Sequence, residues 1–161
     1  MKSIITCCLT ALMIMGCAGM NGLKIEPSSG PEGECMFTIV NQYDDDIAVK
    51  FFNVQDLNNH VHYIYVASAR QATIRKMAPG NYIIRYSKGK EWDPKTKQFL
   101  IGRENYETDQ KFVLEAKEYT EETAEGTRTV RQFSHQEFTL GSRSNDGTIS
   151  TQEISDEEFQ K

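Results

Sequence analysis

The stretch Met77-Ala78-Pro79-Gly80-Asn81-Tyr82-Ile83-Ile84-Arg85-Tyr86 joins two short apolar segments through a tight turn. Pro79 fixes φ near the value that a turn needs at its second position, and Gly80 tolerates a positive φ at the third. The flanking segments, residues 71–77 and 81–87, have the length of ordinary strands. The stretch therefore predicts two β-strands connected at Pro79-Gly80.

Apolar segments separated by turn residues continue in both directions from this point. The further predicted strands cover residues 35–41, 47–54, 60–67 and 98–101, and a long hairpin of 111–123 with 127–140 closes near Glu125-Gly126. Residues 60–67 are apolar on both faces, which is typical of a central strand. The distal half of the hairpin is polar, so we expect it to project into solvent with opposite charges facing each other across its strands.

Seven or eight short strands in this pattern predict an all-β domain, an antiparallel β-sandwich over residues 35–140. The Pro79-Gly80-Asn81-Tyr82 motif resembles the Pro-Gly-x-Tyr hairpin of transthyretin-like and carboxypeptidase-regulatory-like sandwiches. The resemblance implies that Tyr82 packs into the core and that the turn closes one end of the sandwich. It concerns the fold and says nothing about activity.

A second decisive stretch lies near the N-terminus. Lys2 precedes an apolar run over residues 4–15, which has the length of a signal-peptide core and is too short to span a bilayer. The run ends in Ile14-Met15-Gly16-Cys17, which resembles the lipobox of bacterial lipoproteins. The resemblance implies a signal peptide of residues 1–16, cleavage before Cys17, and a diacylglycerol on its sulfur. The alternative is an ordinary secretory signal cut after Ala18, which would release a soluble protein.

The lipoprotein interpretation predicts a palmitate-type anchor in the cell envelope. Ala18 follows the cysteine where aspartate signals inner-membrane retention in enterobacteria, so an outer-membrane location, on its periplasmic or surface face, is favoured if the source is Gram-negative. Residues 17–34 are rich in Gly, Pro and Ser and are predicted to be a flexible linker. Residues 141–161 are polar and predicted to be a disordered tail, except for a possible helical turn capped by Ser155.

Charge and cysteine content narrow the possible partners. The net charge of −5 becomes −6 once Lys2 leaves with the signal. This acidity argues against nucleic-acid binding and against electrostatic adhesion to anionic lipid, so membrane attachment would depend on the lipid anchor alone. Cys7 and Cys8 leave with the signal and Cys17 is blocked, so only Cys35 remains. We expect Cys35 to be buried, and the alternative is an intermolecular disulfide.

The segment Lys88-Gly89-Lys90-Glu91-Trp92-Asp93-Pro94-Lys95 holds the only tryptophan. Trp92, with Lys90 and Asp93, is a candidate recognition loop, because an aromatic ring among polar groups suits a binding anchor. The alternative is that Trp92 folds inward and covers one end of the sandwich. His60 and His62 would share a strand face and could chelate a metal, but the sequence has no third ligand at a familiar spacing. The run Asp44-Asp45-Asp46 lacks the glycine and the terminal glutamate of a calcium loop, so we expect a solvated turn.

No familiar catalytic motif, phosphate-binding loop or cofactor motif is present, so we expect no enzymatic activity, no cofactor and no metal. The sequence predicts a membrane-anchored envelope lipoprotein with a protein-binding or structural role, which includes an assembly subunit of an envelope or secretion complex. A small-molecule or glycan-binding module is the alternative, kept open by Trp92 and by the tyrosines of residues 60–67.

Overall fold

The computed structural model describes residues 17–141 and 150–161. The predicted signal peptide and residues 142–149 of the tail lie outside the described residues. The elements are η1 Cys17–Met20, β1 Lys24–Glu26, β2 Glu32–Asn41, β3 Asp46–Asn53, β4 Asp56–Val66, β5 Gln71–Met77, β6 Gly80–Asp93, β7 Gln98–Thr108, β8 Phe112–Leu114, β9 Ala116–Thr123, β10 Gly126–Phe133, β11 His135–Leu140, β12 Thr151–Glu153 and α1 Asp156–Gln160.

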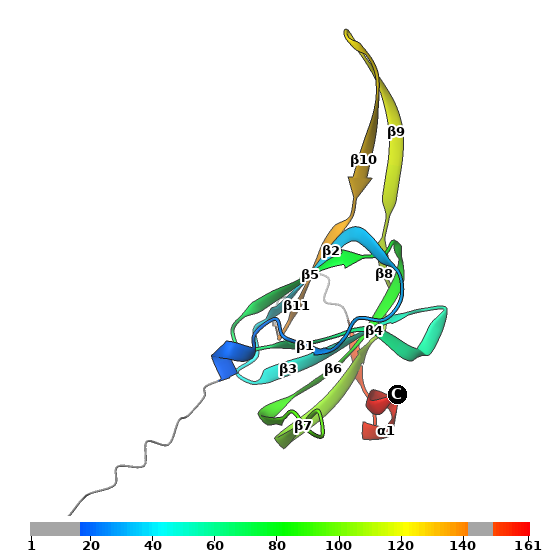
Figure 1. Ribbon diagram of the computed structural model, residues 1–161. Coiled ribbons are helices and arrows are strands. Elements are labelled where there is room, and N and C mark those ends of the chain that lie inside the picture. Colours follow the sequence, from blue (N-terminus) through cyan, green and yellow to red (C-terminus); the bar gives the residue numbers. More distant parts are fainter. Residues whose placement is uncertain (1–16, 142–149) are drawn as a thin grey trace, which may run out of the picture.

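Most strands belong to one large antiparallel sheet with the order β1-β4-β3-β6-β7-β12 (Figure 1). The three-residue strand β8 pairs with the start of β6. β4, which contains the predicted central strand of residues 60–67, lies between β1 and β3. β3 in turn lies between β4 and β6. Seven of its eight residues pair directly with both neighbours; Val49, for example, lies opposite Ile64 and Tyr86.

A smaller sheet with the order β11-β2-β5 packs against the large one. β5 runs antiparallel to β2, but β11 runs parallel to it, with His135 opposite Met36 and Leu140 opposite Asn41. The expected long hairpin of residues 111–123 and 127–140 is therefore wrong at its base. Its two roots separate, since β8 joins the large sheet and β11 joins the small one.

The main core fills the space between the two sheets. The ring of Phe37 from the small sheet lies 5.1 Å from the rings of both Phe51 and Phe112, in edge-to-face contacts. Tyr82 is buried in the same core and its hydroxyl donates to the Ala78 carbonyl at 2.8 Å. The all-β sandwich predicted from the sequence is confirmed.

The turn at Pro79-Gly80 connects the two sheets and does not form a hairpin. β5 belongs to the small sheet and β6 to the large one, so the chain crosses from layer to layer at this point. Gly80 begins β6 and is not among the residues with positive φ, contrary to the expected turn geometry.

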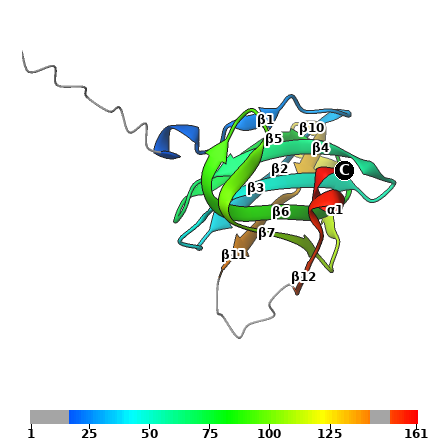
Figure 2. The same cartoon turned by 90° about the horizontal axis from the view of Figure 1, so that it is seen from below.

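A second apolar layer covers the outer face of the large sheet, which is the face turned away from the small sheet. Its buried members are Ala48, Tyr63, Tyr65, Ala67, Phe99 and Phe159, and the side chains of Met20, Ile25, Trp92 and Ile154 pack around them. Met20 and Phe159 come from the two ends of the described chain. α1 lies on this face beside β6 and β7 (Figure 2), and η1 contributes Met20 to the layer.

Two expectations about the chain ends are therefore wrong for the described residues. The predicted linker contains β1, which pairs with β4, and β2 already begins at Glu32. The predicted disordered tail contains β12 and α1. The helical turn capped by Ser155 is confirmed, because Ser155 and Glu158 form a reciprocal capping box.

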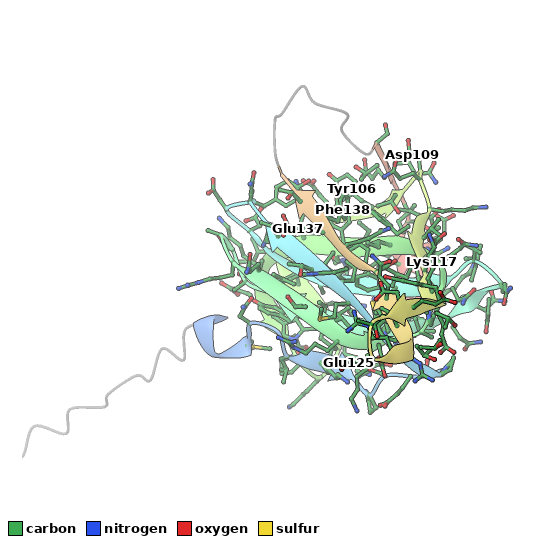
Figure 3. All side chains as sticks on the ribbon, turned by 90° about the horizontal axis from the view of Figure 1, so that it is seen from above. Tyr106, Asp109, Lys117, Glu125, Glu137 and Phe138 are labelled. Atoms are coloured by element: carbon green, nitrogen blue, oxygen red, sulfur yellow. The ribbon has the colours of Figure 1, made fainter. Side chains whose placement is uncertain are left out.

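β9 and β10 form an arm (residues 116–133) that rises out of the body (Figure 1). Residues 126–133 pair in register with 116–123, and Gly126 has a φ of 127° at the tip. In Figure 3 the arm points toward the viewer, with Lys117 on β9 and Glu125 in the turn. The solvent-exposed distal hairpin predicted from the sequence is confirmed.

Candidate functional site

The chain that follows Cys17 is fixed to the body within a few residues. The Asn21 side chain accepts a hydrogen bond from the Ala67 amide at 3.0 Å and donates one to the Gln71 carbonyl at 2.9 Å. The Gly22 amide bonds to the Tyr65 carbonyl and the Tyr65 amide to the Leu23 carbonyl, both at 2.9 Å. Cys17 is the first residue of η1. Its lipidation stays a prediction.

Trp92 lies in a strand and not in a loop. β6 extends to Asp93, where Trp92 pairs with Phe99 of β7. The indole ring lies 5.0 Å from the Phe99 ring, 5.7 Å from Tyr65 and 6.4 Å from Tyr63. The half-buried ring is thus part of the outer apolar layer, which is the geometry that the inward-folded alternative requires.

Lys90 and Asp93 form contacts within the domain, with Asp45 and with the turn after β6 respectively. The Lys90 ammonium lies 3.6 Å from a carboxylate oxygen of Asp45 in the β2–β3 connection. Asp93 accepts hydrogen bonds from the Lys95 amide and the Thr96 hydroxyl, and these bonds lower the pKa of its carboxyl. Asp93 therefore organises the turn of the β6–β7 hairpin. A recognition role for Trp92, Lys90 and Asp93 stays a prediction.

Lys50 is the most unusual ionisable residue in the described chain. It sits on β3 with an exposed fraction of 3%, under α1. Its ammonium donates a 2.7 Å hydrogen bond to the Phe159 carbonyl and lies 4.9 Å and 5.1 Å from the ring centres of Phe159 and Tyr63. Burial lowers the pKa of Lys50 from 10.5 to about 8.

Arg85 assists Lys50 in holding α1. Its guanidinium donates to the Glu158 carbonyl at 3.0 Å and pairs with the Glu107 carboxylate at 2.6 Å. The last carbonyls of a helix have no partner within the helix and form its negative end. Two cations from the large sheet satisfy those carbonyls here, which explains why a five-residue helix stays in place.

A charged cluster borders this site at the edge of the large sheet. The Glu26 carboxylate lies 2.6 Å from the Lys97 ammonium and 3.1 Å from the His60 imidazole. The hydrogen bond from Lys97 is the main cause that lowers the pKa of Glu26. Burial is the main cause that lowers the pKa of His60. These contacts attach β1 and the β6–β7 turn to β4.

His60 and His62 do not share a strand face, contrary to the prediction. The β3–β4 register skips Val61, with Phe52 opposite His60 and Phe51 opposite His62. This bulge turns His60 toward Tyr63 on the outer face and His62 toward Phe51 in the main core. Burial lowers the pKa of His62 to about 4. The two rings cannot chelate one ion in this arrangement.

Cys35 and Asp46, also singled out in the sequence, have structural partners. Cys35 is fully buried, as expected, and its thiol faces the Glu115 carbonyl at 3.5 Å. Asp46 accepts hydrogen bonds from the Tyr65 hydroxyl at 2.5 Å and the Ser68 amide at 2.7 Å. Within residues 17–141 and 150–161 no group of three or more His, Cys, Asp or Glu side chains could hold a metal ion.

The arm is the most exposed element of the fold. Arg128 pairs with Glu121 at 2.8 Å and Arg131 with Glu118 at 2.7 Å, each directly across the ribbon, which confirms the predicted cross-strand charges. Such exposed pairs set the register but add little stability. Tyr119, which is 45% exposed, lies opposite Val130 on one face.

A hollow of about 230 Å³ lies where the arm meets the body. It is lined by Gly33, Glu34, Pro79, Ala116, Lys117, Glu118, Arg131 and Phe133. The sequence predicts that the hairpin is solvent-exposed, but not this hollow, because Gly33 and Pro79 join it only through the fold.

A functional assignment of this chain rests on its fold and on its candidate site. No protein-family model, curated protein or solved structure matches the chain. No helix in the described part of the chain is both long and apolar enough to cross a membrane. The protein is mostly β-strand, with antiparallel sheets and one parallel pair.

Proposed function

We propose that the chain is a non-enzymatic envelope lipoprotein that is anchored through Cys17 and presents its arm to a protein partner. The proposal rests on the positions of η1, which begins at Cys17, and of the arm. The arm leaves the body on the side away from η1 (Figure 1). A lipid on Cys17 would therefore hold the body at the membrane and direct the arm away from it.

The arm has the physical features of a protein-binding element. Within residues 17–141 and 150–161, β9 and β10 pair only with each other, so no described strand occupies the outer edge of either one. Such an edge can accept an additional strand from another protein. Tyr119 adds an exposed ring of the kind enriched at interfaces, and the charged residues beside it disfavour unspecific strand pairing.

The resemblance to transthyretin-like and carboxypeptidase-regulatory-like sandwiches concerns the architecture of the body. Burial of Tyr82 agrees with what that resemblance implies, whereas the chain crosses between the two sheets at Pro79 and forms no hairpin there. The resemblance bears on the architecture alone, because these folds carry many different functions. Assembly into a larger envelope complex is the form of protein binding that a projecting arm suits best.

Site-specific photo-crosslinking in intact envelopes tests the proposal. A photoreactive amino acid at Tyr119 should give a discrete protein adduct. The matched control is Leu57, which is 42% exposed in the β4 segment and lies outside the arm. An adduct at Tyr119 that persists in the Cys17→Ala variant would assign the specificity to the domain. Equal adducts at both positions, or none at Tyr119, would contradict a partner-binding arm.

A further inference from the structure

The chain between η1 and β2 lies along β4. We call this part, residues 21–31, the tether. β1 within it pairs with β4, and beyond β1 the Ser29 amide donates to the Val61 carbonyl at 3.0 Å. Next to this bond, the Ser28 hydroxyl lies 2.9 Å from Nδ1 of His62. A titratable ring of β4 is therefore in direct contact with a side chain of the tether.

The His62 ring is buried on the side of the main core. It is 8% exposed, and the ring centres of His62 and Phe51 lie 6.4 Å apart. Burial is the main cause that lowers the pKa of His62, and the charges of Lys24 on β1 and of His60 on β4 act in the same direction. A proton on this ring would thus place a cation beside two groups that repel it.

His60, the other histidine of β4, has different neighbours. Its Nε2 lies 3.1 Å from the Glu26 carboxylate of β1, which also binds the Lys97 ammonium. Lys50 and Lys97 disfavour a proton on His60, whereas Glu26 favours one. A proton on His60 would gain an ion pair with the tether, which a proton on His62 would not. His62 is therefore the ring whose protonation opposes the attachment.

The tether forms an edge of the large sheet. Hydrogen bonds join it to β4 from Gly22 to Ser29. Among the described strands, β1 pairs only with β4, whereas β4 also pairs with β3. An edge segment of this kind can open locally without breaking the pairing of the inner strands. We therefore expect the tether to open as one unit while the body stays folded.

We infer that His62 is a pH-sensitive switch whose protonation releases the tether from β4. The closed tether keeps the ring away from water, and opening lets water reach it. The pKa of His62 is lowered from 6.5 to about 4 in the closed state, so between these values the open state binds more protons. The attachment is thus complete above pH 6.5 and weakens as pH falls toward 4. Between pH 7 and pH 5 the opening constant should rise about 20-fold.

Release would change the anchoring of the domain, and only this consequence rests on the proposed lipidation of Cys17. With the tether closed, the chain is fixed to the body from Asn21 onward. With the tether open, residues 18–31 form a flexible connection with an average span of about 20 Å. Acidification would then let the domain stand away from the membrane and give the arm a wider reach.

Hydrogen exchange tests the inference. The full-length gene product is purified from cells in detergent, with or without lipid on Cys17, and exchange is followed by mass spectrometry at pH 7 and pH 5. Each rate is divided by the rate of an unstructured chain at the same pH. We expect protection of peptides that contain Gly22 and Ser29 to fall about 20-fold at pH 5. Peptides from β6 should stay better protected than the tether at both pH values.

Two histidine variants identify the switch. His62→Gln removes the titrating ring but keeps a polar side chain that can bond to Ser28, and it should lose most of the fall in protection. His135→Gln is the control, because His135 lies on β11 and bonds to Thr38 away from the tether. It should keep the wild-type fall. Trp92 emission at both pH values checks that each variant is folded.

Three outcomes would overturn the inference. The first is equal protection of the tether at pH 7 and pH 5 in the wild-type protein. The second is a fall of the same size in His62→Gln, which would assign the effect to another group. The third is protection of the tether that matches that of β6, which would mean that the tether opens only when the body unfolds. These outcomes leave the lipid anchor untouched, because the measurement does not require lipid on Cys17.

Discussion

The Lys50 ammonium donates a 2.7 Å hydrogen bond to the carbonyl of Phe159, which links the centre of the large sheet to the last turn of the chain. The Phe159 side chain is 2% exposed and covers the same ammonium with its ring. α1 therefore closes the outer face of the sheet, and Lys50 supplies the charge that its carbonyl end requires. Removal of either residue should release the other.

Phe159→Ala should detach α1. Loss of a buried aromatic ring costs about 3–5 kcal/mol in a core, and a terminal element loses less because it can open locally. We expect a loss of about 2 kcal/mol in the free energy of unfolding, rapid hydrogen exchange in residues 156–160, and a rise in the pKa of Lys50. Gln160→Ala, an exposed neighbour, should change none of these. Unchanged exchange in Phe159→Ala would contradict the role of this contact.

Stability should rise with pH above pH 8 because of Lys50. Its pKa is lowered from 10.5 to about 8 in the folded protein, so between these values the unfolded chain binds more protons than the folded one. Urea denaturation should give a free energy of unfolding about 1–2 kcal/mol higher at pH 9.5 than at pH 8. The increase should be missing in Lys50→Met.

The pH range of this measurement has to stop below the tyrosine titrations. Burial raises the pKa of Tyr63 and of Tyr86, so at higher pH the folded protein holds protons that the unfolded chain has lost. Stability should then fall as pH rises past 10. An equal increase between pH 8 and 9.5 in wild type and Lys50→Met would assign the effect to other groups.

Gly89→Ala should destabilise the bend that brings the β6–β7 hairpin over the outer apolar layer. A methyl group at Gly89 would lie 2.7 Å from the Phe99 Cβ atom and 2.9 Å from the Ile101 carbonyl oxygen. Such overpacking costs about 1–3 kcal/mol, measurable by urea denaturation. Gly19→Ala places its methyl in open space and is the control. Equal free energies of unfolding for Gly89→Ala and Gly19→Ala would contradict the predicted overpacking at the bend.

Removal of the arm should leave the body folded. Replacing residues 118–131 with a two-residue Asn-Gly turn keeps the Lys117–Gln132 pair and removes side chains that are mainly exposed. We expect the free energy of unfolding to change by less than about 1 kcal/mol, because exposed residues contribute little. Loss of cooperative unfolding in this variant would assign the arm to the fold and would weaken its proposed role in binding.

The strands that carry a clear apolar pattern could be predicted from the sequence. β5 has the predicted bounds and β3 differs from its prediction by one residue at each end. In both strands local alternation and flanking turn residues act in the same direction. The buried Cys35 could be predicted for the same reason, because it begins an apolar run that becomes part of β2.

The elements that were missed depend on distant partners. β1, β12 and α1 are short and polar, and they are ordered through a few long-range contacts such as that of Phe159 with Lys50. The face of His60 depends on a bulge at Val61, which the regular two-residue period of a strand cannot predict. The alternation of residues along β3 would place Lys50 on a solvent-facing side. Nothing in that strand indicates that Phe159 of α1 covers it.

Cys17 should carry the lipid that places this domain at the membrane. Intact-mass measurement of protein extracted from the membrane fraction tests this lipidation. We expect a chain that begins at Cys17 and carries the added mass of a diacylglyceryl group, with or without a third acyl chain, and loss of the added mass in Cys17→Ala. An unmodified mass, or an acyl group that survives Cys17→Ala, would contradict it.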